Sequence, residues 1–367
     1  MEKQSYISSR QIIVLLIMTR LPFSTAYYVA LNAGKSIQDI LYAVPVNFIL
    51  NFIVAIPILM LLKKYPGKDI IELASNIIGK AAGIIVAVFY MFCFILLAVY
   101  MHATFQDFFV NAIIPESTYY DIAIPLLVVA FYGAVKGIEA IARFGSIVII
   151  AYLIILSIIA ISLIPHIDFN NLLPVFYNGP QYFWGAVLNG FNSNIQIVFL
   201  IFCAPFLKSG TKTGKLYAKW NVFAMLLFLG LEFLTVAVMG PFVAIQNYPL
   251  STLAMQSRVG VFERIDAIDM ISWILNTVLM ITFYVYFAAG CLMKVGLNKH
   301  KKLITFLIVA IIFAATNYVS NFFVGMHTIT LNPYITVLTL TAMILVPFLI
   351  LIADMIKRRV AGNEKAG

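Results

Sequence analysis

Long apolar runs separated by short polar segments dominate the chain. Ten runs are each long enough to cross a bilayer, and they lie near residues 11–31, 40–62, 81–106, 119–135, 146–164, 181–206, 220–242, 266–293, 303–323 and 334–356. Only helices and closed barrels satisfy every backbone polar group in hydrocarbon, and these runs lack the alternation of barrel strands. The pattern predicts an all-α integral membrane protein of about ten transmembrane helices, with residues 1–367 forming a single transmembrane domain.

Composition strengthens this interpretation. The chain is 63% apolar and 11% charged, whereas a soluble domain is roughly half apolar and a quarter charged. Three cysteines, Cys93, Cys203 and Cys291, fall within apolar runs without the spacing of a disulfide framework or a metal site, which favours simple packing.

The basic residues between the runs predict the orientation. Twenty of the 24 Lys and Arg residues fall on one side, in clusters near 3–10, 63–80, 136–143, 208–219, 294–302 and 357–365. The other side holds Lys35, Arg258 and Arg264, and Arg20 falls inside the first run. Cytoplasmic loops accumulate Lys and Arg, so both termini are expected in the cytoplasm. The net charge of +9 then reflects topology, and no nucleic-acid partner is expected.

Two connecting segments have patterns of their own. Residues 65–80 carry apolar side chains at helical spacing, namely Ile70, Ile71, Leu73, Ala74, Ile77 and Ile78, which is typical of a short amphipathic helix in the membrane interface. A helical linker without a separate task is the alternative. Residues 245–265 are long and partly apolar, which suggests a cap over the outer face or a passive packing segment.

Two of the runs contain helix-breaking sequences. The first run includes Met18-Thr19-Arg20-Leu21-Pro22-Phe23-Ser24-Thr25, and Pro22 removes a backbone donor. The sixth run includes Leu188-Asn189-Gly190-Phe191-Asn192-Ser193-Asn194, a poor helix and a poor surface for lipid. We therefore expect helices 1 and 6 to be broken, although two ordinary kinks would also fit.

The two breaks are five crossings apart, so a repeat of five helices would be inverted in the membrane. Broken helices at matching positions of inverted repeats indicate a transporter-type site at the midplane. We expect repeat one over about 11–164 and repeat two over about 181–356. The candidate ligand-binding residues are polar or break-forming positions near this site: Thr19, Arg20, Pro22, Ser24, Thr25, Tyr100, Gly190, Phe191, Asn192, Asn276 and Thr277.

Arg20 and Glu232 are the two charged residues nearest the middle of predicted spans. A charge at that depth is costly unless it is paired or hydrated, so each is a functional hypothesis. We expect the two side chains to approach one another beside the first break. Arg20 would then supply a fixed positive charge where other transporters bind sodium, or the pair would simply lock the bundle.

No sequence feature indicates an enzyme. The chain lacks a phosphate-binding glycine loop, a nucleophile elbow and paired catalytic carboxylates. The four histidines are scattered, so neither a metal site nor a cofactor is expected.

Several motifs in order along the chain resemble one family. They are Tyr65-Pro66-Gly67-Lys68-Asp69, the stretch Lys136-Gly137-Ile138-Glu139-Ala140-Ile141-Ala142-Arg143, Asn171-Leu172-Leu173-Pro174-Val175, and Phe262-Glu263-Arg264-Ile265-Asp266-Ala267 with Trp273. In order and spacing the chain is similar to the B subunits of spore germinant receptors, the endospore germination permeases of the amino acid–polyamine–organocation transporter superfamily.

This resemblance implies a LeuT-like fold of two inverted five-helix repeats. It also implies a nutrient-sensing subunit in the inner membrane of dormant spores, which binds a small germinant, often an amino acid, and works with germinant receptor A and C subunits. Two alternatives use the same scaffold: an amino acid permease working by alternating access, and an ion or water conduit opened by ligand.

Overall fold

The computed structural model describes residues 6–21, 37–110, 116–177, 179–192, 194–246, 248–258, 266–322 and 333–363. In these ranges the α-helices are α1 (Ser9–Met18), α4 (Asp39–Val54), α5 (Ile56–Lys64), α6 (Ile70–Ile77), α7 (Lys80–Phe108), α8 (Tyr119–Lys136), α9 (Ile138–Leu163), α10 (Pro180–Asn192), α11 (Gln196–Cys203), α12 (Thr213–Met239), α13 (Pro249–Gln256), α14 (Asp266–Leu292), α15 (Lys301–Phe322), α17 (Pro333–Leu340) and α18 (Val346–Asn363). Short 3-10 turns are Ile164–His166, Phe169–Leu172, Ala204–Phe206, Gly240–Ile245 and Asn298–His300, and π-helical segments are Met293–Leu297 and Thr341–Leu345.

Six of the described helical segments are long and apolar enough to cross a membrane, and the bent pair α4–α5 makes a seventh. One of the six, Asp266–Val319, contains both α14 and α15. The first and sixth predicted spans are represented by shorter apolar segments, Ser9–Met18 and Gln196–Phe206. The described helices therefore follow the ten apolar runs in order, with the first and sixth interrupted.

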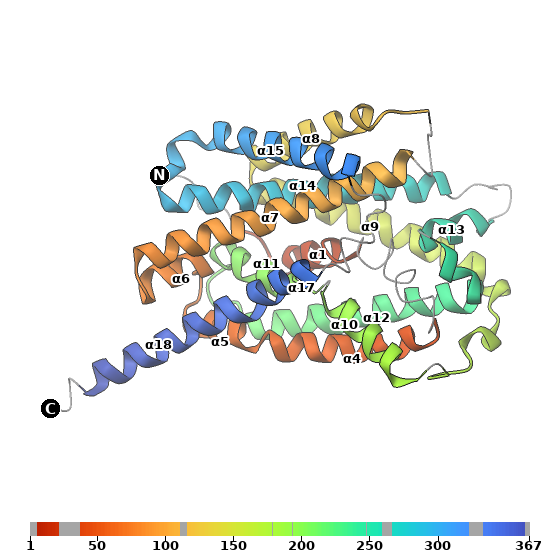
Figure 1. Ribbon diagram of the computed structural model, residues 1–367, viewed down its shortest axis with the longest axis horizontal. Helices are drawn as coiled ribbons and strands as arrows, with labels where there is room; N and C mark the ends of the chain where they lie inside the picture. Colours follow the sequence, from red (N-terminus) through yellow and green to blue (C-terminus); the bar gives the residue numbers. More distant parts are fainter. Residues whose placement is uncertain are drawn as a thin grey trace.

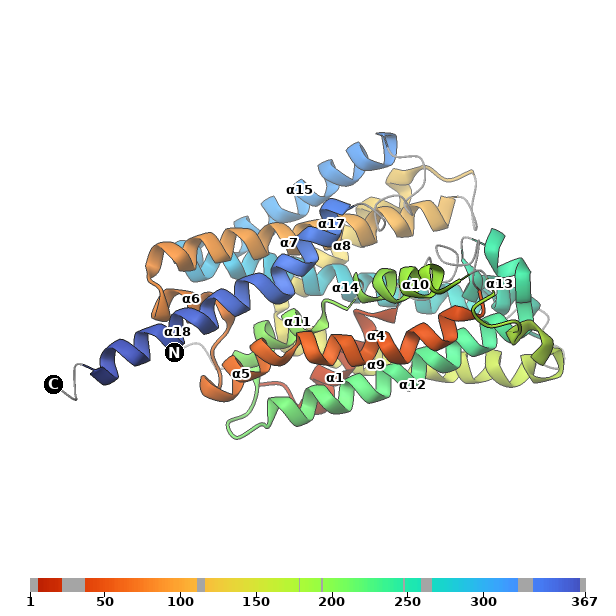
Figure 2. The ribbon, with the colours of Figure 1, turned by 60° about the horizontal axis from the view of Figure 1, so that its bottom comes forward.

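The helices form two groups that lie side by side (Figures 1 and 2). In the first group, α7, α8, α14 and α15 pack against one another. In the second, α4 packs against α10 and α12, and α1 packs against α11 and α12. Helix α9 contacts both α1 and α14, so it joins the two groups.

Local sequence explains where several helices begin and bend. Ser8 starts α1 with a capping box, in which its hydroxyl accepts from Gln11 N at 3.2 Å and Gln11 Oε1 accepts from Ser8 N at 2.9 Å. Pro57 stands at the start of α5, where it removes one backbone donor, and α4 and α5 meet there at 41°.

One end of the molecule, which we call the basic end, holds the end of α5, helix α6 and the cationic residues Lys64, Lys294 and Lys357 (Figure 1). Lys294 pairs with Asp69 and Glu72, and Lys64 pairs with Asp354. Lys357 Nζ donates to the carbonyls of Asn76 and Ile77 at the end of α6. The contacts of Lys294 and Lys357 tie α6 to the segment that follows α14 and to α18, and the Lys64–Asp354 pair ties α5 to α18.

The amphipathic helix predicted within 65–80 is present as α6. Asp69 caps it, since its Oδ1 accepts from the backbone N–H groups of Ile71 and Glu72 at 3.0 Å. Ile70, Ile71, Leu73 and Ala74, four of the apolar residues at helical spacing, are buried. Ile78 is exposed, because it follows the last residue of the helix and leaves the apolar face.

At the opposite end, α13 lies in the segment predicted as a cap. Its preceding residue, Tyr248, donates its hydroxyl proton to Asp107 Oδ2 at 2.6 Å, and Ser251 Oγ donates to Asp269 Oδ2 at 3.2 Å. Asp107 lies in the last turn of α7 and Asp269 in the first turn of α14. The helix is therefore fastened to the ends of two long helices.

Candidate functional site

The break in the sixth span separates α10 from α11. Helix α10 ends at Asn192 and α11 begins at Gln196. Asn194 N still bonds to Phe191 O at 2.9 Å, and Val198 N bonds to Ile195 O at 3.0 Å. The predicted interruption of this helix is confirmed, and Gly190 and Phe191 lie buried beside it.

The first span is interrupted inside the predicted motif, at Thr19 and Arg20, before Pro22 is reached. Helix α1 ends at Met18, and Thr19 and Arg20 form a turn in which Arg20 N bonds to Ile17 O at 2.9 Å. The Thr19 hydroxyl donates to Leu16 O at 3.1 Å. Pro22, Ser24 and Thr25 lie outside the described residues, as does the side chain of Asn192.

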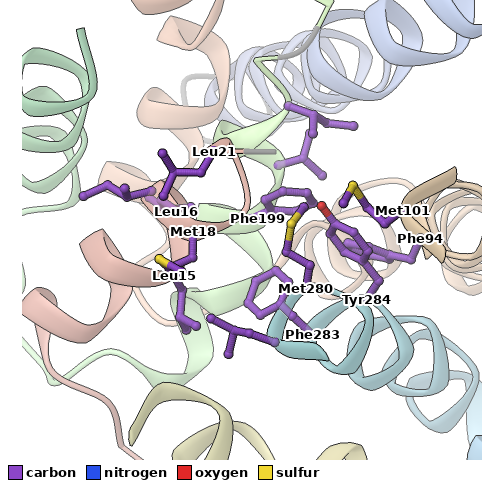
Figure 3. Close-up of a cluster of buried hydrophobic side chains, with 14 of the residues drawn as sticks. Leu15, Leu16, Met18, Leu21, Phe94, Met101, Phe199, Met280, Phe283 and Tyr284 are labelled. Atoms are coloured by element: carbon purple, nitrogen blue, oxygen red, sulfur yellow. The ribbon is translucent and has the colours of Figure 1, made fainter. Parts of the chain in front are cut away.

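Between these breaks lies a cluster of large apolar side chains, which we call the apolar floor: Met18, Met101, Phe199, Met280 and Tyr284 (Figure 3). They come from α1, α7, α11 and α14, the four helices that meet in the middle of the molecule. The Phe199 and Tyr284 rings are 5.6 Å apart. All five side chains are buried.

Ring contacts fix how α7 and α14 lie against each other. Phe94 packs on Phe287 at 5.6 Å, and Phe108 packs on Trp273 at 4.8 Å, so the two contacts are fourteen residues apart on each antiparallel helix. This register puts Met101 at the level of Met280. One turn further toward α13, it puts Thr104 at the level of Thr277.

A layer of polar groups therefore lies directly beyond the apolar floor on all four helices. The Thr19–Arg20 turn follows Met18 directly, and the break that holds Asn194 lies just over one turn before Phe199. On α14, Asn276 and Thr277 lie one turn from Met280. We call this set, with Thr104, the polar layer.

Buried atoms on the α14 side of the polar layer lack an internal partner. Asn276 Oδ1 and the Thr277 hydroxyl are buried and have no hydrogen-bond partner within the part of the chain that the structure describes. A buried polar atom without a partner costs about 1–3 kcal/mol. Both atoms are therefore suited to receive a polar ligand or an ordered water.

The other sequence candidates have different surroundings. Tyr100 is buried on the same face of α7 as Thr104, one turn nearer the basic end. His102, another polar residue in the same apolar run, points to α15, where its Nδ1 lies 3.1 Å from the Thr316 hydroxyl. His102 is thus part of a helix contact and not of the polar layer.

Arg20 and Glu232 are both buried, at 2% exposure each. Helix α1, which ends just before Arg20, packs against α12, which carries Glu232. The Arg20 guanidinium carbon also lies 4.9 Å from the Phe228 ring centre, a favourable cation–π geometry. A direct ion pair between Arg20 and Glu232 stays a prediction.

Sequence reasoning missed two residues that contact this region. Arg20 Nε donates to Asn194 Oδ1 at 2.9 Å, and Asn194 Nδ2 donates to Asn47 Oδ1 on α4. The sequence did contain a hint, because Asn47 and Asn51 lie one turn apart inside an apolar run. Within the described ranges, no group of three or more His, Cys, Asp or Glu side chains could hold a metal ion.

Solved structures with a similar fold are membrane transporters. Mhp1, a nucleobase-cation-symport-1 family transporter in a closed conformation with bromovinylhydantoin bound, matches at a TM-score of 0.62 and 12% identity over 92% of this chain and 78% of its own. A Na⁺-coupled sialic acid symporter in a substrate-bound outward-open state matches at 0.57 and 10% identity, over 91% and 85% of the two chains. The chain thus has the all-α, LeuT-like fold of these transporters, with helices 1 and 6 broken.

Sequence comparisons lead to one family. Spore germination protein XB of Bacillus anthracis is 20% identical over 269 residues, which are 72% of this chain and 74% of the relative. Residues 6–324 match the Spore_permease family, described as spore germination protein. With the transporter fold and the apolar helices, this match shows that the chain is a multi-pass membrane protein and belongs to the spore germination permease family.

Proposed function

We propose that this protein is the nutrient-sensing membrane subunit of a spore germinant receptor. A small germinant, an amino acid, binds in the polar layer between the two helix breaks and triggers germination. The observation that carries the proposal is the pair of buried, unpartnered atoms, Asn276 Oδ1 and the Thr277 hydroxyl, directly beyond the apolar floor. An amino acid supplies both donors and acceptors for such atoms, and its side chain can rest on the apolar floor.

The family and the distribution of basic residues support the membrane location and the orientation of this receptor subunit. The basic end faces the cytoplasm of the spore, with both termini inside, and the chain lies in the spore inner membrane. Receptor A and C subunits carry the response onward. Repeats over about 11–164 and 181–356 form one transmembrane domain, so a change at the two breaks moves both halves together.

We expect one substitution in the polar layer to raise stability and to weaken the response to ligand. Thr277→Val removes a hydroxyl that has no internal partner but keeps its shape, so the ligand-free protein becomes more stable by about 1 kcal/mol. The same change weakens the response to amino acids, because the ligand loses a hydrogen bond. Spores carrying the variant are tested with each of the twenty common amino acids, and the purified chain is tested by unfolding in mixed micelles.

The matched control is Thr282→Val on the same helix. Its hydroxyl already donates to Val278 O at 2.6 Å, so its loss leaves the amino acid response unchanged. If Thr277→Val lowers stability, or leaves the response of every amino acid unchanged, the ligand does not bind at the polar layer.

A second function rests on the transporter fold shared with the two symporters. In that case the chain moves an amino acid across the membrane by alternating access. Uptake of labelled amino acid by proteoliposomes that contain this chain alone would support the permease. Germination that requires the A and C subunits, without uptake, supports the receptor.

A further inference from the structure

A continuous chain of hydrogen bonds crosses the region between the two breaks. Arg20 Nε donates to Asn194 Oδ1 at 2.9 Å, Asn194 Nδ2 donates to Asn47 Oδ1, and Asn47 Nδ2 donates to Val187 O at 2.8 Å. The Arg20, Asn47 and Asn194 side chains are buried. Four separate elements are joined in this way: the end of α1, the break in the sixth span, α4 and α10.

The two ends of this chain determine the direction of every bond in it. Arginine has donors and no acceptor, so Asn194 must present its oxygen to Arg20 and its amide N–H to Asn47. Asn47 must then accept with its oxygen and donate with its nitrogen. That nitrogen meets Val187 O, a carbonyl that can only accept. The side-chain amides of Asn47 and Asn194 therefore each use both their oxygen and their nitrogen in this chain, and neither amide can flip without breaking two hydrogen bonds.

Asn51 provides an internal comparison on the same helix. It lies one turn from Asn47 and is also buried, but its Nδ2 donates to Asn221 Oδ1 of α12 at 3.2 Å. Asn221 Nδ2 in turn donates to Phe48 O on α4 at 3.1 Å. This second amide pair fastens α4 to α12 and touches neither break.

We propose that Asn47, acting through Asn194, is a positioning residue that fixes the Arg20 guanidinium between the two broken helices and so sets the sensitivity of the ligand response. This inference rests on the proposed function, because the ligand binds next to the breaks. The reason is geometric. The Asn47 amide spans the gap from α10 to Asn194, and it therefore determines where the start of α11 and the Arg20 side chain stand relative to each other.

The test compares Asn47→Ala with Asn51→Ala in the full chain. Asn47→Ala leaves both Asn194 Nδ2 and Val187 O without their partner, so the start of α11 is held less firmly. We expect the amino acid concentration for half-maximal germination to rise about tenfold or more, since both buried hydrogen bonds of the Asn47 amide are lost and Asn194 no longer holds Arg20 in place. Asn51→Ala also removes a buried hydrogen bond between α4 and another helix, but it shifts this concentration less than about threefold.

A ligand-free measurement separates this inference from the proposed function. Hydrogen exchange of the amides over 194–199 is followed in the purified chain without amino acid. We expect faster exchange in Asn47→Ala and unchanged exchange in Asn51→Ala. Unchanged exchange in both variants, or faster exchange with an unaltered germination response, overturns the positioning role.

Two further outcomes remain decisive. If spores with the wild-type chain germinate in response to no amino acid, the proposed function fails. If Asn47→Ala still shows faster hydrogen exchange over 194–199 in that case, the role of Asn47 in positioning the break stands. If Asn47→Ala does not accumulate in the membrane, Asn47→Leu replaces it. Leucine has nearly the same volume as asparagine but neither accepts from Asn194 nor donates to Val187 O, so the same loss of sensitivity is expected and its absence refutes the inference.

Discussion

Lys294→Met tests whether the basic end is held together by charge. Lys294 bonds to Asp69, whose side chain is 1% exposed, and to the half-exposed Glu72. Losing one partner of a buried pair costs about 3–5 kcal/mol. Asp69 keeps two backbone N–H bonds from Ile71 and Glu72, and Lys294 is itself 30% exposed, so we expect a loss of about 2 kcal/mol in the free energy of unfolding.

This loss depends on pH in a defined direction. Burial raises the pKa of Asp69 above its usual value, and the Lys294 ammonium partly opposes that rise. Without Lys294 the pKa of Asp69 in the folded state rises further. Between the pKa of the unfolded chain and this raised value, the folded state binds more protons, so stability falls as the pH rises. The variant is therefore closer to wild type at pH 5 than at pH 8.

The assay is unfolding of the purified chain in mixed micelles of dodecyl maltoside and sodium dodecyl sulfate, at both pH values. Asp69→Asn in the Lys294→Met background removes the unpaired charge but keeps a good helix cap, and most of the loss at pH 8 is recovered. Lys302→Met, at an exposed position on the first turn of α15, changes stability by less than about 0.5 kcal/mol. An equal loss at both pH values, or no recovery by Asp69→Asn, would refute the reasoning.

Three further variants test packing and the cap. Phe94→Ala empties a position surrounded by three rings at 4.9–6.0 Å and lowers the free energy of unfolding by about 3–5 kcal/mol; a loss under about 1 kcal/mol would mean that the rings do not pack as described. Gly133→Ala places a methyl group 2.6 Å from Thr282 Cγ2 and costs about 1–3 kcal/mol, and adding Thr282→Ser restores stability by removing that methyl; no recovery contradicts the close approach. Tyr248→Phe removes the 2.6 Å bond to Asp107, so amides of α13 exchange faster while the other helices are unchanged; unaltered exchange shows that the bond does not hold α13.

The fold could be predicted from the sequence because its main rules are local. Each apolar run satisfies its own backbone as a helix, whatever its neighbours are. The breaks were also local, since the proline motif after Arg20 and the Asn-rich stretch around Asn192 weaken a helix without help from other residues. The interruption between α10 and α11 falls where that stretch predicted it.

The candidate site was only partly predictable, because it depends on which helix faces are brought together. Asn276 and Thr277 were identified as polar residues in an apolar run, and both are buried in the polar layer. His102 had the same sequence character, yet it faces α15. The difference lies in helix rotation, which the ring contacts between α7 and α14 fix and the sequence of either helix alone does not.

By itself the sequence determined that this chain is an integral membrane protein, how many times it crosses the bilayer, and where two of its helices are interrupted. Each of these properties follows from a single segment and the solvent around it. Only the tertiary structure decided that Arg20 bonds to Asn194, 174 residues away, and that Asn194 bonds to Asn47, 147 residues away. A buried amide must find a partner, but its own segment does not say which one. That choice is made when the helices pack, since only then do the complementary donors and acceptors meet.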